Sequence, residues 1–357
     1  MDSLCHYFGI RDSIYTAGRL AFEQSIYERK ISVIWTLKNL IAKHSPSKLA
    51  NFSTCVSFSA ATCFMTQTFS APQVVCRPAI ARDHADIAEF CKGIWDGGDY
   101  VPEVWTHWYN DPNGVLVTAE YNGHAIGCAK LSLIDEGQWW LEGFRVDPNK
   151  QGLKVGSKIH YYLTDWWVEH GNGTLRLMTE NPAVVHLCEK TGYIKTHELR
   201  GYRSIPIDEP TDNFSPATDT VEAAAFAISS KSVKLVDNLI DFGWRIARPN
   251  EHTFEKYSGY KADFVHTFYW WKDKQGLFSA WEDEDEGQRK LTLGVLACTV
   301  NDIPAMLMDI RRFASRKNFD KVTLLAFLNP QLLAQLEKAG FSTSWENYLR
   351  LFERKKS

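Results

Sequence analysis

Apolar and polar residues follow regular periods from about Val74 onward in this 357-residue chain. Period-two alternation and short apolar runs predict four strands before Pro148. These strands cover 74–77, 115–121, 125–134 and 139–146. Asn122-Gly123 is a strong hairpin signal between the second and third strands, and Glu136-Gly137 marks the next turn. The last three strands should therefore form an antiparallel meander.

Helix signals occupy the segments around these strands. Two helices are expected between the first and second strands, over 82–94 and 102–109. After Pro148 the apolar period changes to about 3.6, which predicts a helix that ends near Gly171. A strand over 174–179, a helix over 183–190 and a closing strand from Tyr193 follow. The predicted order is β-α-α-β-β-β-α-β-α-β, an α/β (α+β) arrangement.

The pattern divides the chain into four segments. We expect a poorly patterned extension over 1–70, a first domain over 74–205, a Pro-rich linker over 206–219 and a second domain over 220–357. Near its end, the second domain repeats the order and spacing of strand, Asn-Pro, helix and Gly-aromatic found at 175–193. This repetition predicts an internal duplication.

Composition narrows the class of function. The net charge of −3 provides no basic field for nucleic acid, and no apolar run is long enough to span a membrane as a helix. The eight cysteines have no C-x-x-C pair, which predicts reduced thiols, and the acidic run 282–286 lacks the spacing of a calcium loop. We expect a cytoplasmic protein without a metal, or an organellar one if residues 1–64 are a transit peptide.

The most informative stretch joins the strand ending at Val146 to the helix that follows it. Helix N-termini bind anions because their first N–H groups lack partners and the helix dipole places positive charge there. Gly152 and Gly156 allow close approach of a ligand to the backbone, and Lys154 adds a cation. The alternative is a plain turn with two glycines. Dinucleotide and nucleoside triphosphate fingerprints are both absent from the sequence.

This loop resembles that of the GNAT acyltransferases, which reads Arg/Gln-x-x-Gly-x-Gly/Ala after a strand. Gln151 and Gly156 match, whereas Lys154 stands where the pattern has its first glycine. The resemblance implies a GNAT fold with a mixed, mostly antiparallel sheet, and acetyl-CoA as cosubstrate. It also implies a degenerate second GNAT-like domain, because 293–303 lacks the loop. The residues implied to bind the cosubstrate are Phe144, Val146, Gln151, Gly152, Leu153, Lys154, Val155, Gly156, Ser157 and Asn181.

Two further segments carry the resemblance. Asn181-Pro182-Ala183 through Tyr193 is similar to a second GNAT motif, in which Cys188 replaces a tyrosine that many members use as general acid. A buried small hydrophobe is the alternative role for Cys188. Residues 97–102, 134–137 and 141–146 look like the vertebrate histidine N-acetyltransferase group. The implied reaction is acetylation of a small amine, with histidine as the first candidate acceptor.

Acetyl transfer to an amine requires a base and a site for the thioester carbonyl. Glu142 is the candidate base, because its apolar sequence neighbours should raise the pKa of its carboxyl, and alternation should place it on the same face as Phe144 and Val146. The family likeness assigns the carbonyl to a backbone N–H near Val146. Tyr100 and Trp140 are candidate acceptor contacts, with a core role as the alternative. A binding protein without activity and a protein N-acetyltransferase stay open as alternative functions.

Overall fold

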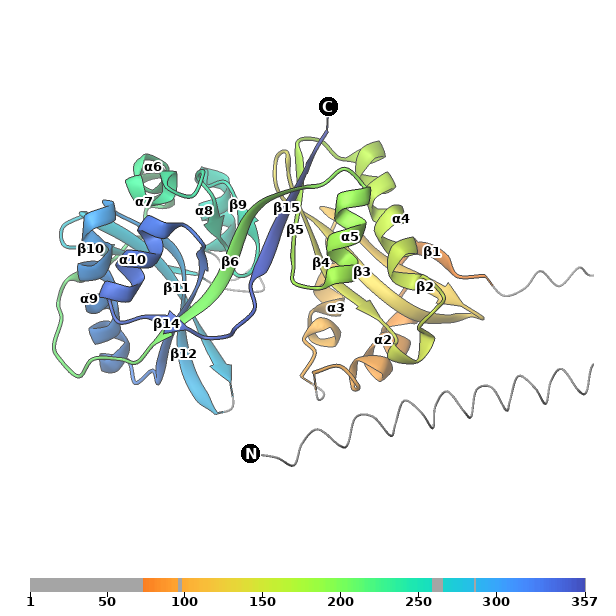
Figure 1. The fold of residues 1–357 in the computed structure, drawn as a ribbon, viewed down its shortest axis with the longest axis horizontal. Helices are drawn as coiled ribbons and strands as arrows, with labels where there is room; N and C mark the ends of the chain where they lie inside the picture. Colours follow the sequence, from red (N-terminus) through yellow and green to blue (C-terminus); the bar gives the residue numbers. More distant parts are fainter. Residues whose placement is uncertain (1–72, 96–97, 259–265, 286, 357) are drawn as a thin grey trace, which may run out of the picture. The chain divides into compact units, whose positions relative to one another are not determined.

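The computed structural model describes residues 73–95, 98–258, 266–285 and 287–356 (Figure 1). The expected extension over 1–70 and its transit-peptide alternative lie outside the described residues. The described residues fall in one unit, Phe69–Ser357, through which a single 13-stranded sheet runs. No helix in these ranges is long and apolar enough to cross a membrane. The five cysteines described, which lie between Cys76 and Cys298, are all unbridged.

The first half of the described chain has the predicted order of elements. It begins with β1 (Val75–Pro78), α2 (Asp83–Cys91), α3 (Val101–Asn110), β2 (Gly114–Tyr121), β3 (His124–Asp135) and β4 (Gln138–Val146). It continues with η3 (Pro148–Lys150), α4 (Val155–His170), β5 (Thr174–Thr179), α5 (Pro182–Lys190) and β6 (Ile194–Ser204). Strands β2, β3 and β4 pair antiparallel, which confirms the predicted meander.

The second half starts with small elements and ends with a larger strand and helix set. The small elements are β7 (Phe214–Pro216), α6 (Thr220–Ser229), α7 (Lys231–Lys234), β8 (Ile240–Asp241), β9 (Ile246–Ala247) and α8 (Glu251–Tyr257). The later elements are β10 (Thr267–Trp271), β11 (Gly276–Asp285), β12 (Gln288–Ala297), η4 (Val300–Asp302), α9 (Ile303–Arg316), β13 (Lys321–Phe327), α10 (Pro330–Lys338), β14 (Ser342–Thr343) and β15 (Leu349–Lys355). The segment expected as a linker contains β7, which pairs with β10.

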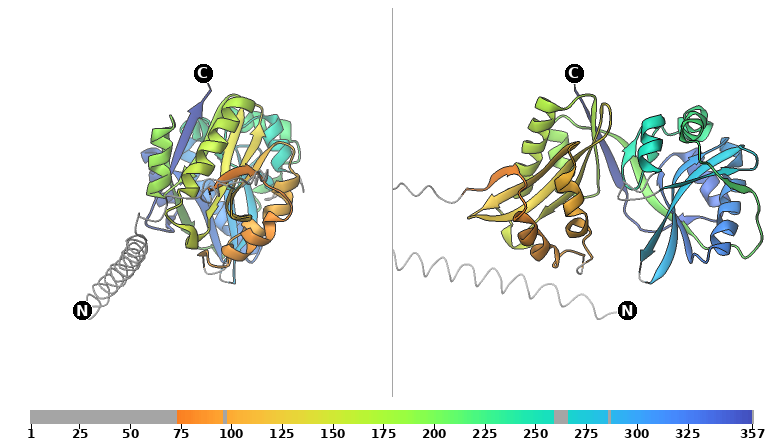
Figure 2. Two further views of the ribbon diagram at one scale, coloured as in Figure 1. Left: turned by 90° about the vertical axis from the view of Figure 1, so that its right-hand side faces the viewer. Right: turned by 180° about the vertical axis from the view of Figure 1, so that it is seen from behind.

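The two halves exchange their last strands. Along the large sheet the strand order is β1-β2-β3-β4-β5-β15-β6-β13-β12-β11-β10-β7. The C-terminal strand β15 therefore lies between β5 and β6 and is antiparallel to both, while β6 also pairs with β13. Figure 2 shows the dark blue β15 beside the green β6. Only β4 with β5 and β12 with β13 are parallel, so the predicted mixed, mostly antiparallel sheet is confirmed.

A buried ion pair fixes β15 in the first half of the sheet. Nε of Arg176 on β5 lies 2.7 Å from Oε1 of Glu353 on β15, and both side chains are almost fully buried. Gln138 also accepts a hydrogen bond from Arg176. A buried charge that loses its partner is costly, so this pair ties the end of the chain to the strand on which the first half depends.

The two faces of β4 pack against different parts of the molecule. Trp139 and Leu141 join a core cluster with Val155, Ile159 and Leu163 of α4, as the apolar period of that helix predicts. Trp140, on the opposite face, packs in the core cluster of the second half. One side of β4 therefore supports α4 and its preceding loop, while the other side contacts residues that come much later in the chain.

Candidate active site

The loop between β4 and α4 has two residues in the left-handed region of backbone conformation. Gly152 has φ of 84° and Lys154 has φ of 57°. A hypothetical Cβ on Gly152 would meet nothing within 4 Å, so this glycine serves backbone conformation rather than close packing. Lys154 adopts at some cost the conformation that a glycine would adopt freely. The departure from the family pattern at Lys154 therefore leaves the course of the loop intact.

Backbone N–H groups along this loop are available to a ligand. Within the described residues, the four consecutive N–H groups of Lys154–Ser157, at the start of α4, have no hydrogen-bond partner. The first turn of α4 contains no acidic residue, and Lys154 is exposed at its N-cap. Gly156 packs against Phe144 and Val146, where a Cβ would be 3.5 Å and 3.9 Å from their side chains. This arrangement suits a pyrophosphate, because both the dipole and the N–H groups favour negative charge.

Strand β4 parts from β5 just before this loop. Their parallel pairing covers only Gln138–Trp140 of β4. Beyond this point, β5 continues with β15 as its partner in the described sheet, and β4 from Leu141 onward does not pair with β5. On the other side, β4 bulges against β3 between the pairs Lys130 with Glu142 and Cys128 with Arg145. Gly143 sits in the bulge with φ of 62°, and a Cβ there would be 2.4 Å from the Trp108 ring. The backbone between Leu141 and Val146 thus has no strand partner on the β5 side in the described sheet.

The bulge overturns the expected orientation of Glu142. Two residues of β4, Gly143 and Phe144, oppose one residue of β3, which shifts the alternation by one position. Phe144 and Val146 consequently pack on the α4 side of the sheet. Glu142 points to the opposite side, where Ser132 Oγ donates to its carboxylate at 2.7 Å. The prediction that Glu142 shares a face with Phe144 and Val146 is wrong.

The surroundings of the Glu142 carboxylate are also more polar than the sequence indicated. Nε of Arg245 lies 3.0 Å from Glu142 Oε2, and the two side chains are 10% and 11% exposed. The expectation of an apolar setting for this carboxylate is wrong, because Arg245 arrives from the second half of the chain. The only local sequence feature next to Arg245 is the turn at Phe242-Gly243. No periodicity in the sequence links that turn to β4. Glu142 as the catalytic base stays a prediction.

The aromatic residues divide into core and surface. Trp105, Trp108, Trp139 and Trp140 are all at most 6% exposed. Trp140 therefore has a core role, and its predicted contact with an acceptor is not supported. Tyr100 is 40% exposed, and its ring lies 5.3 Å from the Arg145 guanidinium. Burial of part of this residue, together with the charge of Glu142, raises the pKa of Tyr100 to about 12.

In the second motif, Asn181 lies at the surface and Cys188 in the core. Asn181 is exposed at the N-cap of α5, where its side chain accepts the N–H of Ala183 at 2.9 Å. It remains available at the surface as a predicted contact for the cosubstrate. Cys188 is fully buried in the same core cluster as Val155, and burial raises the pKa of its thiol to about 12. The structure supports the hydrophobic role of Cys188 and not that of an acid.

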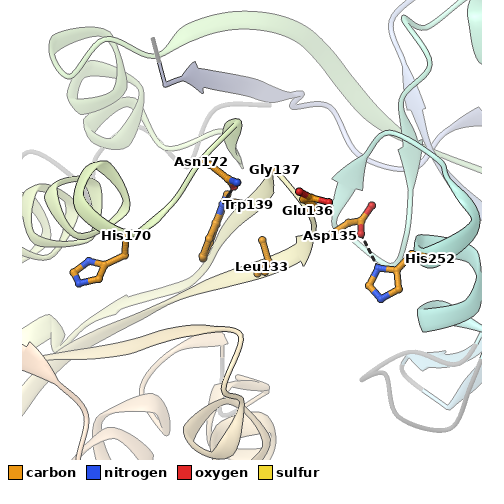
Figure 3. Close-up of a pocket in the computed structure, with 8 residues that line it drawn as sticks. All are labelled: Leu133, Asp135, Glu136, Gly137, Trp139, His170, Asn172 and His252. Atoms are coloured by element: carbon orange, nitrogen blue, oxygen red, sulfur yellow. Dashed lines mark hydrogen bonds and ion pairs between the residues drawn. The ribbon is translucent and has the colours of Figure 1, made fainter.

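A pocket of about 560 Å³ lies at the opposite end of β4 from the loop. Figure 3 shows that it is bordered by the β3–β4 turn, the end of α4 and one residue of α8. Asp135 accepts a hydrogen bond from His252 of α8 at 2.6 Å across this region. Of the predicted site residues, neither Glu142 nor the loop residues line this pocket. It is therefore separate from the candidate site.

Comparison with known proteins finds a family match within the first half. Residues 82–193 match the family model described as Acetyltransferase (GNAT) family. The human protein "Probable N-acetyltransferase 16" is 31% identical over 87 residues, which are 24% of each chain. Histidine N-acetyltransferase of Oreochromis niloticus is 33% identical over 82 residues, 23% of this chain and 24% of that one. This chain thus aligns with about a quarter of the length of these curated relatives.

A solved structure extends the likeness of fold to both halves. The tandem GNAT protein from the clavulanic acid biosynthesis pathway aligns with a TM-score of 0.53 over 79% of this chain and 98% of that one. Its sequence identity of 10% limits the likeness to the fold. The predicted GNAT fold with a large mixed sheet is confirmed, and the predicted acetyl-CoA-dependent activity stays a prediction. Residues 82–193 of this chain are thus similar to the GNAT acetyltransferase family.

Proposed function

We propose that this protein transfers the acetyl group of acetyl-CoA to the amine of a free amino acid or a related metabolite. Histidine is the first acceptor to test, because the relatives with which part of this chain aligns include histidine N-acetyltransferases. The observation that carries the proposal is the row of N–H groups at Lys154–Ser157, none of which bonds within the described residues. Lys154, Gly156 and Asn181 would complete the contacts with the cosubstrate.

Glu142 is proposed to take the proton of the acceptor amine. A neutral amine attacks the thioester carbonyl carbon, the new C–N bond forms and the C–S bond breaks. The amine proton passes to Glu142, directly or through water, and the leaving thiolate of coenzyme A takes a proton from solvent. The backbone of β4 near Val146 is the proposed partner of the carbonyl oxygen, since β4 leaves β5 there.

The second half is proposed to be a degenerate GNAT-like domain that shapes the acceptor site. Its run β10-β11-β12-α9-β13-α10-β15 has the order of β2-β3-β4-α4-β5-α5-β6, and each run has one parallel strand pair. Its sheet is joined to the first by strand exchange. It also delivers Arg245 to Glu142. These contacts support a role at the acceptor side rather than an independent function.

A binding protein without activity is the second candidate. The ion pair of Glu142 with Arg245 and the full burial of Cys188 favour it, because both remove groups from general acid and base catalysis. In this alternative the loop would still bind coenzyme A. Affinity for the cosubstrate therefore does not distinguish the two candidates, whereas turnover does.

The test is release of coenzyme A from acetyl-CoA, followed with a thiol reagent, in the presence of each proteinogenic amino acid in turn. Peptides with free N-termini or lysines form a second panel. Release that depends on a free amino acid supports the proposal. Release with peptides alone would replace it with protein acetylation, and tight binding of coenzyme A without any release would favour the binding protein.

A further inference from the structure

Arg245 is the residue of the second half that meets the proposed base. Its Nε lies 3.0 Å from Oε2 and 3.3 Å from Oε1 of Glu142. Both side chains are about nine-tenths buried, so the contact is shielded from bulk water. A pair of this kind places one fixed positive and one fixed negative group side by side next to the splayed part of β4.

The turn that carries Arg245 is held in a demanding conformation. Gly243 and Trp244 both have positive φ, 72° and 66°, and such a conformation is costly for a bulky aromatic residue. The buried carboxyl of Asp241 accepts the N–H of Trp244 at 2.6 Å, and the N–H of Phe242 donates to the carbonyl of Arg245 at 2.9 Å. The turn is therefore constrained by the surrounding structure to present the residue after Trp244.

Contacts outside the turn fix it further. The Trp244 ring stacks on Trp345, with centroids 6.0 Å apart and an angle of 18° between the planes. The backbone of Asp241 lies close to Gly294 on β12, where a Cβ would be 2.6 Å from its carbonyl oxygen. The position of Arg245 is thus determined by β12 and by the segment before β15, both from the second half.

The other charged groups around Glu142 have partners of their own. Arg145 forms two hydrogen bonds with Asp99, and Lys130 pairs with Asp111 at 2.8 Å. Lys256 of α8 donates to the carbonyls of Leu133 and Ile134. Asp135, whose negative charge also affects Lys256, accepts hydrogen bonds from Asn250 and His252. Arg245 is therefore the cation that directly contacts the proposed base.

We propose that Arg245 binds the α-carboxylate of the acceptor while Glu142 faces its amine. In an α-amino acid these two groups are attached to the same carbon, so they can meet two side chains that are already in contact. A guanidinium matches a carboxylate through paired N–H donors, and it stays charged throughout the accessible pH range. This inference rests on the proposed function and narrows its acceptor to amines that carry an adjacent carboxylate.

The experiment compares L-histidine with histamine, which has the same amine and ring but lacks the carboxylate. Steady-state rates and calorimetric binding are both measured with the full chain for the wild type, Arg245→Gln and Arg245→Lys. The matched control is Arg248→Gln, which removes the same charge from an exposed side chain three residues away. Comparison with histamine separates loss of the carboxylate contact from general damage to the site, because damage lowers both acceptors together.

Wild type should favour histidine over histamine in kcat/KM and in affinity. Arg245→Gln should reduce that preference by about 10- to 100-fold, mainly through KM, which is the usual effect of losing a hydrogen bond to a charged group. Arg245→Lys should retain part of the preference, and Arg248→Gln all of it. An equal loss for both acceptors, or an unchanged preference, would overturn the assignment of Arg245.

Binding and turnover are measured separately, so the role of Arg245 and the proposed function can be tested independently. Carboxylate-dependent binding without turnover would support Arg245 as the carboxylate contact and reject acetyl transfer to histidine. Turnover that is indifferent to the carboxylate would support acetyl transfer and reject the role of Arg245. Absence of both binding and turnover with either acceptor would overturn the role of Arg245 and reject histidine as the acceptor.

Discussion

Two junctions of this molecule each lead from a bulged strand into an amphipathic helix, β4 into α4 and β12 into α9. Of these two, the β4–α4 junction alone is suited to an anion. The first presents N–H groups over Lys154–Ser157 that make no hydrogen bond within the described chain. In the second, Asp302 is the N-cap of α9, Pro304 lies in its first turn, and the backbone at Cys298 is bonded by Ser232. A carboxylate at a helix start repels a phosphate.

The strands before the two junctions differ in a related way. Both β4 and β12 contain a bulge in their antiparallel pairing. Around it, β4 carries Glu142, whereas β12 carries Leu293 and Val295, which are both buried apolar residues. Both halves thus keep the same order of strands and helices, while the groups needed for binding and proton transfer are found together in the first half.

The largest effect is expected from Glu142→Gln. If Glu142 is the base, kcat should fall by about 100- to 10,000-fold with little change in affinity for acetyl-CoA. Initial rates across a range of pH provide the measurement, and the exposed Glu169→Gln on α4 is the control. A variant with the wild-type rate and pH profile would show that no proton transfer depends on this carboxylate.

A carboxylate placed in the first turn of α4 should strongly weaken cosubstrate binding. Gly156→Asp should weaken coenzyme A by roughly 100-fold or more, because a fixed negative charge would face the pyrophosphate. The fold should tolerate it, since a Cβ at this position meets its neighbours at ordinary distances. The matched variant Ala305→Asp, at an exposed site in the first turn of α9, should leave the affinity unchanged. Equal effects of the two substitutions would break the comparison between the junctions.

Strand exchange predicts that the two halves unfold together. Glu353→Gln should lower the free energy of unfolding by about 3 kcal/mol, because Arg176 would lose its partner in a buried setting. Denaturant unfolding followed by tryptophan fluorescence and by circular dichroism should give one coincident transition. Glu337→Gln, on the exposed face of α10, is the control. Two separate transitions would indicate that the halves are independent domains.

The smallest effects are expected from substitutions at two helix N-caps. Asn181 and Asn329 each cap the helix that begins at the following proline. Either change to alanine should cost about 1 kcal/mol of stability. Only Asn181→Ala should also raise the Kd of coenzyme A, by about 3-fold or more, if this side chain contacts the cosubstrate as well. Thermal melts and calorimetry distinguish the two readouts, and an equal Kd for both variants would remove Asn181 from the site.

Local patterns were sufficient to predict most elements of the first half. Strand 174–179 was predicted with its observed ends, and the meander followed from Asn122-Gly123. The loop at Gln151 was recognisable because a helix N-terminus and nearby glycines have the same physical meaning in any fold. These features depend on residues close together in the sequence, which is why the sequence alone predicts them.

Contacts between distant segments could not be predicted in this way. The exchange that pairs β15 with β5 joins residues more than 170 positions apart, such as Arg176 and Glu353. Arg245 reaches Glu142 through a turn whose sequence gives no hint of its partner. The orientation of Glu142 was missed for a different reason, because a single bulge at Gly143 reverses the alternation on which the prediction relied.

Calorimetric titration of coenzyme A into the full chain counts its binding sites. We expect one binding site per chain, strongly weakened in Gly156→Asp and retained in Ala305→Asp. Two sites per chain would show that the β12–α9 junction also binds the cosubstrate, and a single site that survives Gly156→Asp would place it away from the β4–α4 loop. Either result would contradict the assignment of binding to the first junction alone.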